Sequence, residues 1–283
     1  MAWTWGRSQQ TGRVAALVVA VALAAAACSS SGGDGDSAHA DATTTTAEAE
    51  RLTVLVTNDD GVDAPGIDAL VEGLLGLGDV DVTVVAPADQ RSGTGDQSTE
   101  GVIAFEETTT ASGYPAVAVD GFPADSVNVA LDEVLDEPPD VVISGINSAP
   151  NLANLVHLSG TVGAAREAVR RGVPALASSQ GQGEPPDYAS GVEQVLAWLE
   201  DHRDDLLAGT ATVQIWNLNI PTCPTGEVRA IVEVPTHTAT DLSFEVVDCT
   251  SGLEDPIHDV DAFVNGFAPL AVLDPELTGV PAP

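Results

Sequence analysis

Apolar residues along the first two thirds of the chain follow two alternating patterns, short continuous runs and helix-like spacing. A continuous apolar run predicts a strand that is covered on both faces, as in a parallel sheet. Apolar positions that recur every three or four residues predict an amphipathic helix. The runs span residues 52–56, 80–86, 140–144 and 173–177, and the helical patterns span residues 64–77, 123–135, 161–171 and 190–207. This alternation predicts a doubly wound α/β domain over residues 51–208.

Shorter elements interrupt and extend this domain. Residues 102–105 and 116–119 predict two short strands that form a hairpin-like excursion. The last 75 or so residues, 209–283, contain strand patterns in place of the strand and helix alternation, at residues 213–220, 228–234, 242–247 and 268–273. We interpret residues 209–283 as a β-rich C-terminal extension of the sheet or as an oligomerisation arm.

The amino-terminal residues have the pattern of a targeting signal. Arg7 and Arg13 precede a short apolar run, residues 14–27, which predicts a signal peptide over residues 1–27. Cys28 follows, and this junction resembles a bacterial lipoprotein cleavage site, although Leu23 lies two positions upstream of the usual place. An ordinary signal peptide and an uncleaved anchor are the alternatives. Residues 28–50 are polar and of low complexity, which predicts a lipidated Cys28 followed by a flexible linker.

These features predict an exported protein that a lipid holds at the outer face of the bacterial cell membrane. The 283-residue chain has 9 basic and 43 acidic residues, a formal net charge of −34. Such a charge disfavours binding to a nucleic acid polymer, and it leaves the lipid as the expected membrane contact. Cys223 and Cys249 are the other two cysteines. An exported domain can pair them, and two free thiols are the alternative.

Polar residues follow three of the predicted strands. Asp59 and Asp60 follow the first, Ser92 follows the second, and Asn147 and Asn151 follow the third. The carboxyl ends of parallel strands meet at one edge of a sheet, where open α/β folds bind ligands. Adjacent carboxylates repel each other, and a hard divalent cation removes that repulsion. The oxygen-only set suits Mg²⁺, Mn²⁺ or Ca²⁺.

A second polar cluster opens a predicted helix. Ser159, Gly160 and Thr161 lie where free backbone N–H groups and the positive end of the helix dipole favour a phosphate group. Each feature also has an ordinary structural interpretation. Ser159 or Thr161 can be a helix N-cap, Asn147 can be a turn former, and the two aspartates can belong to a solvated loop.

Several motifs in order over residues 52–180 resemble the SurE family of survival proteins, which are 5′/3′-nucleotidases. They include VTNDDGVDAPGI, VVAPADQRSGTG, PDVVISGINSAPN and SGTVGAAREA. The resemblance implies a Rossmann-like three-layer α/β sandwich. It also implies hydrolysis of nucleoside 5′-monophosphates, with 3′-monophosphates as further candidates. The C-terminal extension would then serve a homodimer or homotetramer.

The resemblance also implies roles for particular residues. It places Mg²⁺ or Mn²⁺ on Asp59, Asp60, Ser92 and Asn147, with Asp59 and Asp60 in catalysis. We expect phosphate binding at Asn58, Asn151, Ser159, Gly160 and Thr161.

The sequence departs from the family pattern around these motifs. The family usually has Thr where Phe122 stands, and Gly where Ala149 and Ala153 stand. These differences bear on substrate choice and on the shape of the loop around Asn151. Two rival functions follow: a surface-tethered, metal-dependent nucleotide- or phosphate-binding protein without turnover, and a broad acid phosphatase or exopolyphosphatase.

Overall fold

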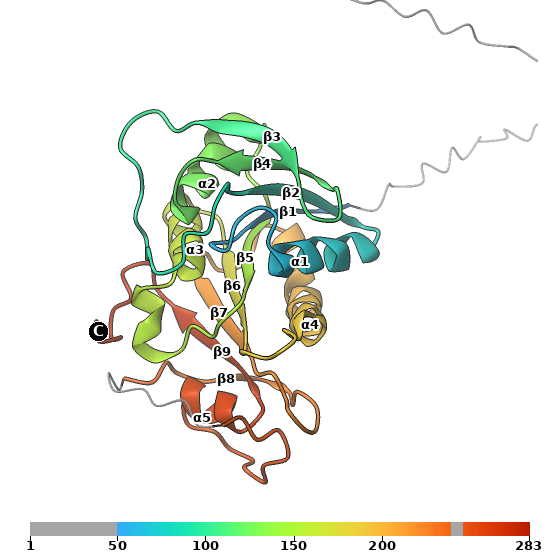
Figure 1. The fold of residues 1–283 in the computed structure, drawn as a ribbon, viewed down its shortest axis with the longest axis vertical. Helices are drawn as coiled ribbons and strands as arrows, with labels where there is room; N and C mark the ends of the chain where they lie inside the picture. The colour runs from blue at the N-terminus through green and yellow to red at the C-terminus, as the bar shows by residue number, and fades with distance from the viewer. Residues whose placement is uncertain (1–49, 239–245) are drawn as a thin grey trace, which may run out of the picture. The chain divides into compact units, whose positions relative to one another are not determined.

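One nine-stranded sheet runs through the residues that the computed structural model describes, 50–238 and 246–283 (Figure 1). Neighbouring strands are parallel except for the pairs β3/β4 and β7/β9, which are antiparallel. The strand order across the sheet is β3 (Phe105–Thr109), β4 (Pro115–Val119), β2 (Val80–Pro87), β1 (Leu52–Thr57), β5 (Val141–Asn147), β6 (Ala175–Gln180), β7 (Ile215–Ile220), β9 (Ala268–Leu273) and β8 (Ile231–Glu233).

Helices cover both faces of the central strands, which gives three layers and confirms the predicted α/β sandwich. Helices α1 (Pro65–Gly76) and α4 (Tyr188–Leu207) pack together on one face. Helices α2 (Pro123–Val129) and α3 (Gly160–Arg170) pack together on the other. The short helix α5 (Asp259–Val264) lies beside β9. Figure 1 shows the two helix pairs on opposite sides of the sheet.

Alternating side chains of β1 supply both halves of the core. Leu52, Val54 and Val56 are buried in the cluster under α1 and α4, whereas Leu55 is buried in the cluster under α2 and α3. Successive side chains of a strand point to opposite faces, so a strand covered twice needs apolar residues at nearly every position. Replacing Leu55 by Ala would cost about 2 to 5 kcal/mol through lost burial and the cavity left behind.

The structure corrects several predicted boundaries. The helix expected over residues 123–135 consists of α2 followed by a π-helical turn, Ala130–Val134. Strand β3 begins at Phe105 because residues 102–104 do not pair with β4, and Val102 is fully exposed. Strand β5 continues to Asn147, three residues beyond the prediction.

The C-terminal part extends the same sheet. Strand β7 pairs in parallel with β6, so the sheet continues across the predicted domain boundary at residue 208. Strand β8 is three residues long and pairs with β9 at the edge of the sheet. The sequence pattern did not predict α5. The strand expected over residues 242–247 falls largely outside the described residues, and 246–247 form no strand. The predicted oligomer stays a prediction.

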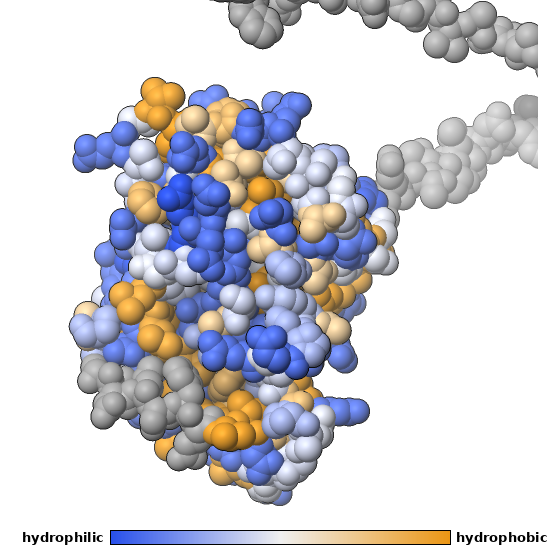
Figure 2. Space-filling view, in the orientation of Figure 1, coloured by the Kyte–Doolittle hydropathy of each residue, from blue (hydrophilic) through white to orange (hydrophobic). Residues whose placement is uncertain are grey.

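A disulfide joins Cys223, which follows β7, to Cys249, which precedes α5. Hydrophilic side chains cover much of the face seen in Figure 2. The helices formed by residues 50–238 and 246–283 include none that is long and apolar enough to cross a bilayer. The predicted signal peptide, Cys28 and the linker lie outside the described residues, apart from Glu50.

Candidate active site

The order of the strands changes direction between β1 and β5. From β1 the chain proceeds outward to β2 and β4, and it then returns to add β5, β6 and β7 on the other side. In open α/β sheets such a switch point leaves a crevice at the carboxyl ends of the strands, where ligands bind. Asp59 and Asp60 follow β1, and Asn147 ends β5, so these residues flank the switch point.

Asp59 is a buried carboxylate with a defined orientation. Its side chain is 2% exposed, and its Oδ1 atom accepts a hydrogen bond from the Thr161 hydroxyl at 2.6 Å. Burial raises the pKa of Asp59 from 3.8 to about 6, while the Thr161 hydroxyl opposes the rise and the charge of Asp60 adds to it. No arginine among the described residues forms an ion pair with Asp59. This carboxylate therefore lacks the cation that usually compensates a buried charge.

The amino end of α3 approaches Asp59 closely. A Cβ atom on Gly160 would lie 2.7 Å from the Asp59 Cβ atom and 3.0 Å from its Oδ2 atom, so only glycine permits this approach. The Ser159 hydroxyl accepts a hydrogen bond from the Val162 N–H at 3.0 Å and serves as the N-cap of α3. The hydroxyls of Ser159 and Thr161 are thus engaged with the helix and with Asp59, and the positive end of α3 lies beside this carboxylate.

Asp60 is more exposed than Asp59 and is held by the loop after β5. The Ser148 backbone N–H donates to its Oδ2 atom at 3.1 Å, and the Ser148 hydroxyl donates to its Oδ1 atom at 3.3 Å. Tyr188, at the start of α4, lies nearby: burial and then the charge of Asp60 raise the pKa of its hydroxyl. Two loops from neighbouring strands therefore converge on Asp60.

The loop after β2 reaches the site through its backbone. The Arg91 N–H donates to the Asp59 carbonyl oxygen at 2.6 Å, which ties the loop that carries Ser92 to the loop that carries the carboxylate pair. Ser92 is exposed. Asn147 is 6% exposed, and its Nδ2 atom donates to the Ala149 carbonyl at 2.5 Å. The Asn147 Oδ1 atom is thus the side-chain group left to act as a ligand.

The other two predicted phosphate ligands have structural contacts. The Asn58 amide spans the turn, donating to the Gly61 carbonyl at 2.8 Å and accepting from the Gly61 N–H at 3.2 Å. The Asn151 backbone is bound by Asn217 and Asn219 of β7, and its Nδ2 atom donates to Ser179 at 2.8 Å. The structure thus uses both amides to fix the loops that carry Asp59, Asp60 and Asn147.

These oxygen donors suit a hard divalent cation. Within the described residues, no group of three or more His, Cys, Asp or Glu side chains is placed to hold a metal, so an ion here would depend on two carboxylates with hydroxyl and amide oxygens. Burial and the charge of Asp60 both raise the pKa of Asp59, so a positive charge bound here would stabilise the ionised carboxylate. Mg²⁺ characteristically binds through one or two carboxylates plus waters and substrate phosphate. The residues present therefore fit such an ion.

Comparison with known proteins decides the family. The model of the family described as "Survival protein SurE" matches residues 54–241, which include both carboxylates, Ser92, Asn147 and the start of α3. The chain belongs to the SurE family. The match ends within the segment between β8 and α5, so the last part of the chain lies beyond it.

Relatives and a solved structure agree with this membership. A protein of Carboxydothermus hydrogenoformans called "5'-nucleotidase SurE" is 42% identical over 190 residues, covering 64% of this chain and 69% of that protein. The protein of the same name from Synechococcus sp. (strain JA-3-3Ab) is 32% identical over 249 residues, covering 82% and 95%. The crystal structure of the SurE protein from Aquifex aeolicus has a TM-score of 0.63 and 29% identity, covering 80% of this chain and 95% of that one.

Two residues that contact or face Asp60, Ser148 and Tyr188, were not predicted from the sequence. Ser148, which binds Asp60, directly follows Asn147 in the same loop, so its position alone was a usable signal. Tyr188 is the first residue of α4 and directly follows the loop after β6, a fourth loop at the same edge of the sheet. Because that segment, GQGEPPDY, contains no carboxylate pair or hydroxyl cluster, its only signal was that it follows a buried parallel strand.

Proposed function

We propose that this chain is a phosphomonoesterase that hydrolyses nucleoside 5′-monophosphates, and 3′-monophosphates as further substrates, to nucleoside and phosphate. The observation that carries this proposal is the carboxylate pair beside the loops of Ser92 and Asn147, in which Asp59 is buried and has no cationic partner among residues 50–238 and 246–283. Relatives at 32% and 42% identity are called 5′-nucleotidases, which supports the same reaction here.

The proposed site needs a divalent metal, Mg²⁺ or Mn²⁺. Asp59, Asp60, Ser92 and Asn147 would hold it through oxygen atoms. When bound, such an ion supplies Lewis-acid stabilisation of a phosphoryl oxygen and lowers the pKa of a bound water.

The chain itself orients the reacting groups. The Thr161 hydroxyl fixes the rotamer of Asp59, and Ser148 does the same for Asp60 through its N–H and hydroxyl. These hydrogen bonds hold both carboxylates in place before substrate arrives, so little reorganisation is needed at the moment of reaction. In the overall reaction, water oxygen bonds to phosphorus, the ester P–O bond breaks, and the leaving alkoxide takes up a proton.

A phosphate-release assay over a panel of nucleotides tests this function. We expect release from nucleoside monophosphates with Mn²⁺, loss of release with EDTA, and loss in both Asp59→Asn and Asp60→Asn. Nucleotide binding without release would favour the rival binding protein. Equal rates on p-nitrophenyl phosphate, polyphosphate and nucleotides would favour a broad phosphatase. The Asp136→Asn variant is the matched control, because Asp136 is an exposed carboxylate in the segment that leads into the opposite end of β5.

We also propose that the protein is exported and attached to the outer face of the cell membrane by a lipid on Cys28. The Cys223–Cys249 disulfide supports export, because disulfides persist in oxidising compartments. Mass spectrometry of the purified amino terminus tests this proposal, and we expect a lipidated Cys28 as the first residue. A Cys28→Ser variant should move to the soluble exported fraction, since membrane attachment by lipid requires the acyl chains. An intact Met1 would contradict both expectations.

A further inference from the structure

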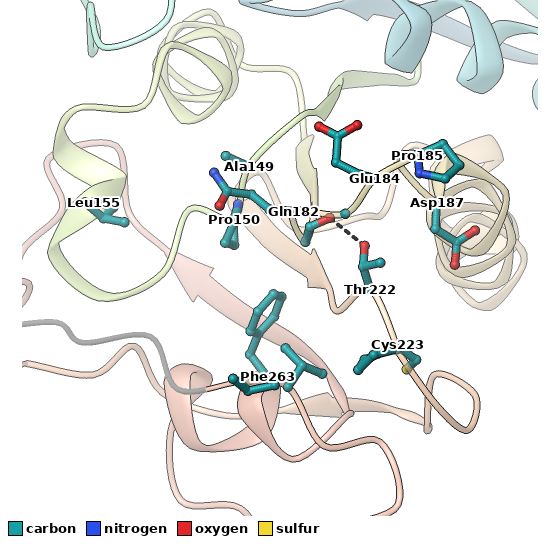
Figure 3. Close-up of a pocket in the computed structure, with 15 residues that line it drawn as sticks. Ala149, Pro150, Leu155, Gln182, Glu184, Pro185, Asp187, Thr222, Cys223 and Phe263 are labelled. Carbon is teal, nitrogen blue, oxygen red and sulfur yellow. Dashed lines mark hydrogen bonds between the residues drawn. The ribbon is translucent and has the colours of Figure 1, made fainter.

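A cavity of about 780 Å³ opens between the loop after β5, the loop after β6 and the C-terminal part of the chain (Figure 3). We propose that this cavity binds the nucleoside part of the substrate, with the base against Phe263. The inference rests on the proposed phosphomonoesterase function and adds to it the site that recognises the leaving group. The volume lies within the range of about 300 to 1,000 Å³ that is usual for small-molecule sites.

The cavity adjoins the carboxylate pair through two short stretches of chain. Ser148 binds Asp60, and the next two residues, Ala149 and Pro150, line the cavity. On the side of α4, Asp187 lines the cavity, and the following residue, Tyr188, lies beside Asp60. The cavity and the carboxylate pair thus share two stretches of chain, so the nucleoside of a monophosphate held at Asp60 would extend toward Ala149, Pro150 and Asp187.

The chemistry of the lining favours an uncharged aromatic group over a second phosphate. The described residues that line the cavity include no Arg or Lys, whereas Glu184 and Asp187 contribute two carboxylates. The Phe263 ring points into the cavity in Figure 3, and the Thr222 hydroxyl is already bound to the Gly181 carbonyl at 2.5 Å. A base can stack on Phe263, because every nucleobase presents an aromatic face. The carboxylates would repel the extra phosphates of a nucleoside di- or triphosphate.

The wall that carries Phe263 is fixed to the sheet. Phe263 belongs to α5, and its ring is close enough to the loop after β6 that a Cβ atom on Gly181 would lie 3.1 Å from it. The Cys223–Cys249 disulfide ties the segment after β7, which also lines the cavity, to the segment before α5. A fixed wall gives the base a preformed surface, which lowers the entropy cost of binding.

Steady-state kinetics on AMP and phenyl phosphate test the role of Phe263. Phe263→Leu keeps an apolar side chain but removes the large ring face. We expect the kcat/KM for AMP, divided by the kcat/KM for phenyl phosphate, to fall about tenfold in this variant. The fall should come from a higher KM for AMP, because the variant loses the stacking of the base on the ring. Phe105→Leu is the matched control, since Phe105 is exposed on β3 at the far edge of the sheet. An unchanged ratio in a folded Phe263→Leu variant overturns the assignment.

A charge reversal at Glu184 tests the same cavity without touching its packed wall. Glu184 is exposed and forms no ion pair with another described residue. We expect Glu184→Arg to raise the rate on ADP relative to AMP by about threefold to tenfold, because the extra phosphate is no longer repelled. Glu193→Gln, on the exposed side of α4, is the control. If Glu184→Arg leaves the ratio of the ADP rate to the AMP rate unchanged, the assignment of this cavity to the nucleoside is wrong.

Adenosine binding separates failure of this inference from failure of the proposed function. Calorimetric titration with adenosine, which carries no phosphate, should show binding to the wild-type protein and about tenfold weaker binding to Phe263→Leu. If the protein hydrolyses no phosphate ester, the proposed function is wrong, and the adenosine titration still decides the cavity. If it hydrolyses esters but binds adenosine equally with and without Phe263, the cavity assignment alone is wrong.

Discussion

Replacing Asp59 by Asn should stabilise the metal-free protein, because it removes a buried negative charge. The pKa of Asp59 rises from 3.8 to about 6 on folding, chiefly through burial. At about 1.4 kcal/mol per tenfold change in the protonation equilibrium, ionised Asp59 costs the folded state about 3 kcal/mol at pH 8. The Asn side chain retains an oxygen that can accept the hydrogen bond from the Thr161 hydroxyl. Burying its NH₂ group costs about 1 kcal/mol, which reduces the stabilisation gained by removing the charge.

The stabilisation should depend on pH in one direction. A carboxyl group whose pKa is raised on folding favours the folded state most at low pH, below 3.8, and that contribution is lost as the pH rises through about 6. The wild-type protein thus loses stability relative to Asp59→Asn across this window. The charge cost at pH 5 is about half of its value at pH 8, so the advantage of the variant should grow by about 1.5 kcal/mol between them.

Urea unfolding in EDTA at pH 5 and pH 8 measures this effect. Subtracting the unfolding free energy of wild type from that of Asp59→Asn at each pH removes the contributions from the titration of all other groups. Asp136→Asn, which removes one exposed carboxylate, is measured in the same way as the control for a change of one surface charge. If the advantage of Asp59→Asn is equal at both pH values, or larger at pH 5, the buried-charge explanation is wrong.

Three further substitutions follow from the structure. Gly160→Val should raise KM for phosphate esters, because a Cβ atom would lie 2.7 Å from that of Asp59; an unchanged KM in steady-state assays would contradict this. Ala153→Gly should stabilise the protein by up to about 1 kcal/mol in urea unfolding, because φ is 48° there; a destabilised variant would refute the strain. The double change of Cys223 and Cys249 to Ser should cost about 3 kcal/mol, since the disulfide bridges a separation of 26 residues; equal midpoints in thermal melts would refute this.

The sequence was sufficient for the layers of the fold because buried parallel strands leave an unambiguous pattern. Near-continuous apolar runs alternate with helical spacing, and β1, β2, β5 and β6 formed where those runs lie. Short elements were harder. Helix α5 has six residues and begins with acidic side chains, so it offers too few positions for a helical period. Strand β5 ends in Gly-Ile-Asn, where polar and small residues concealed its last three positions.

The sequence was enough to predict which residues flank the switch point, but it was not enough to predict which groups they contact. Position at or just after the end of a buried strand marked Asp59, Asp60 and Asn147, but it could not show that Thr161 binds Asp59. Hydroxyl and amide side chains serve equally as ligands, caps and turn formers, and only the packed structure distinguishes these uses. The pairing of Cys223 with Cys249 depends in the same way on the distance between two loops, which spacing along the chain does not reveal.

The claim that the carboxylate pair holds the metal required for hydrolysis is tested most directly by one Mn²⁺ titration. Free Mn²⁺, measured by electron paramagnetic resonance, and phosphate release from AMP are followed in the same samples of wild type and Asp59→Asn. We expect binding and release to rise together in wild type, with one midpoint, and both to be lost in Asp59→Asn. Full release by Asp59→Asn, or release from wild type with no Mn²⁺ bound and EDTA present, would contradict it.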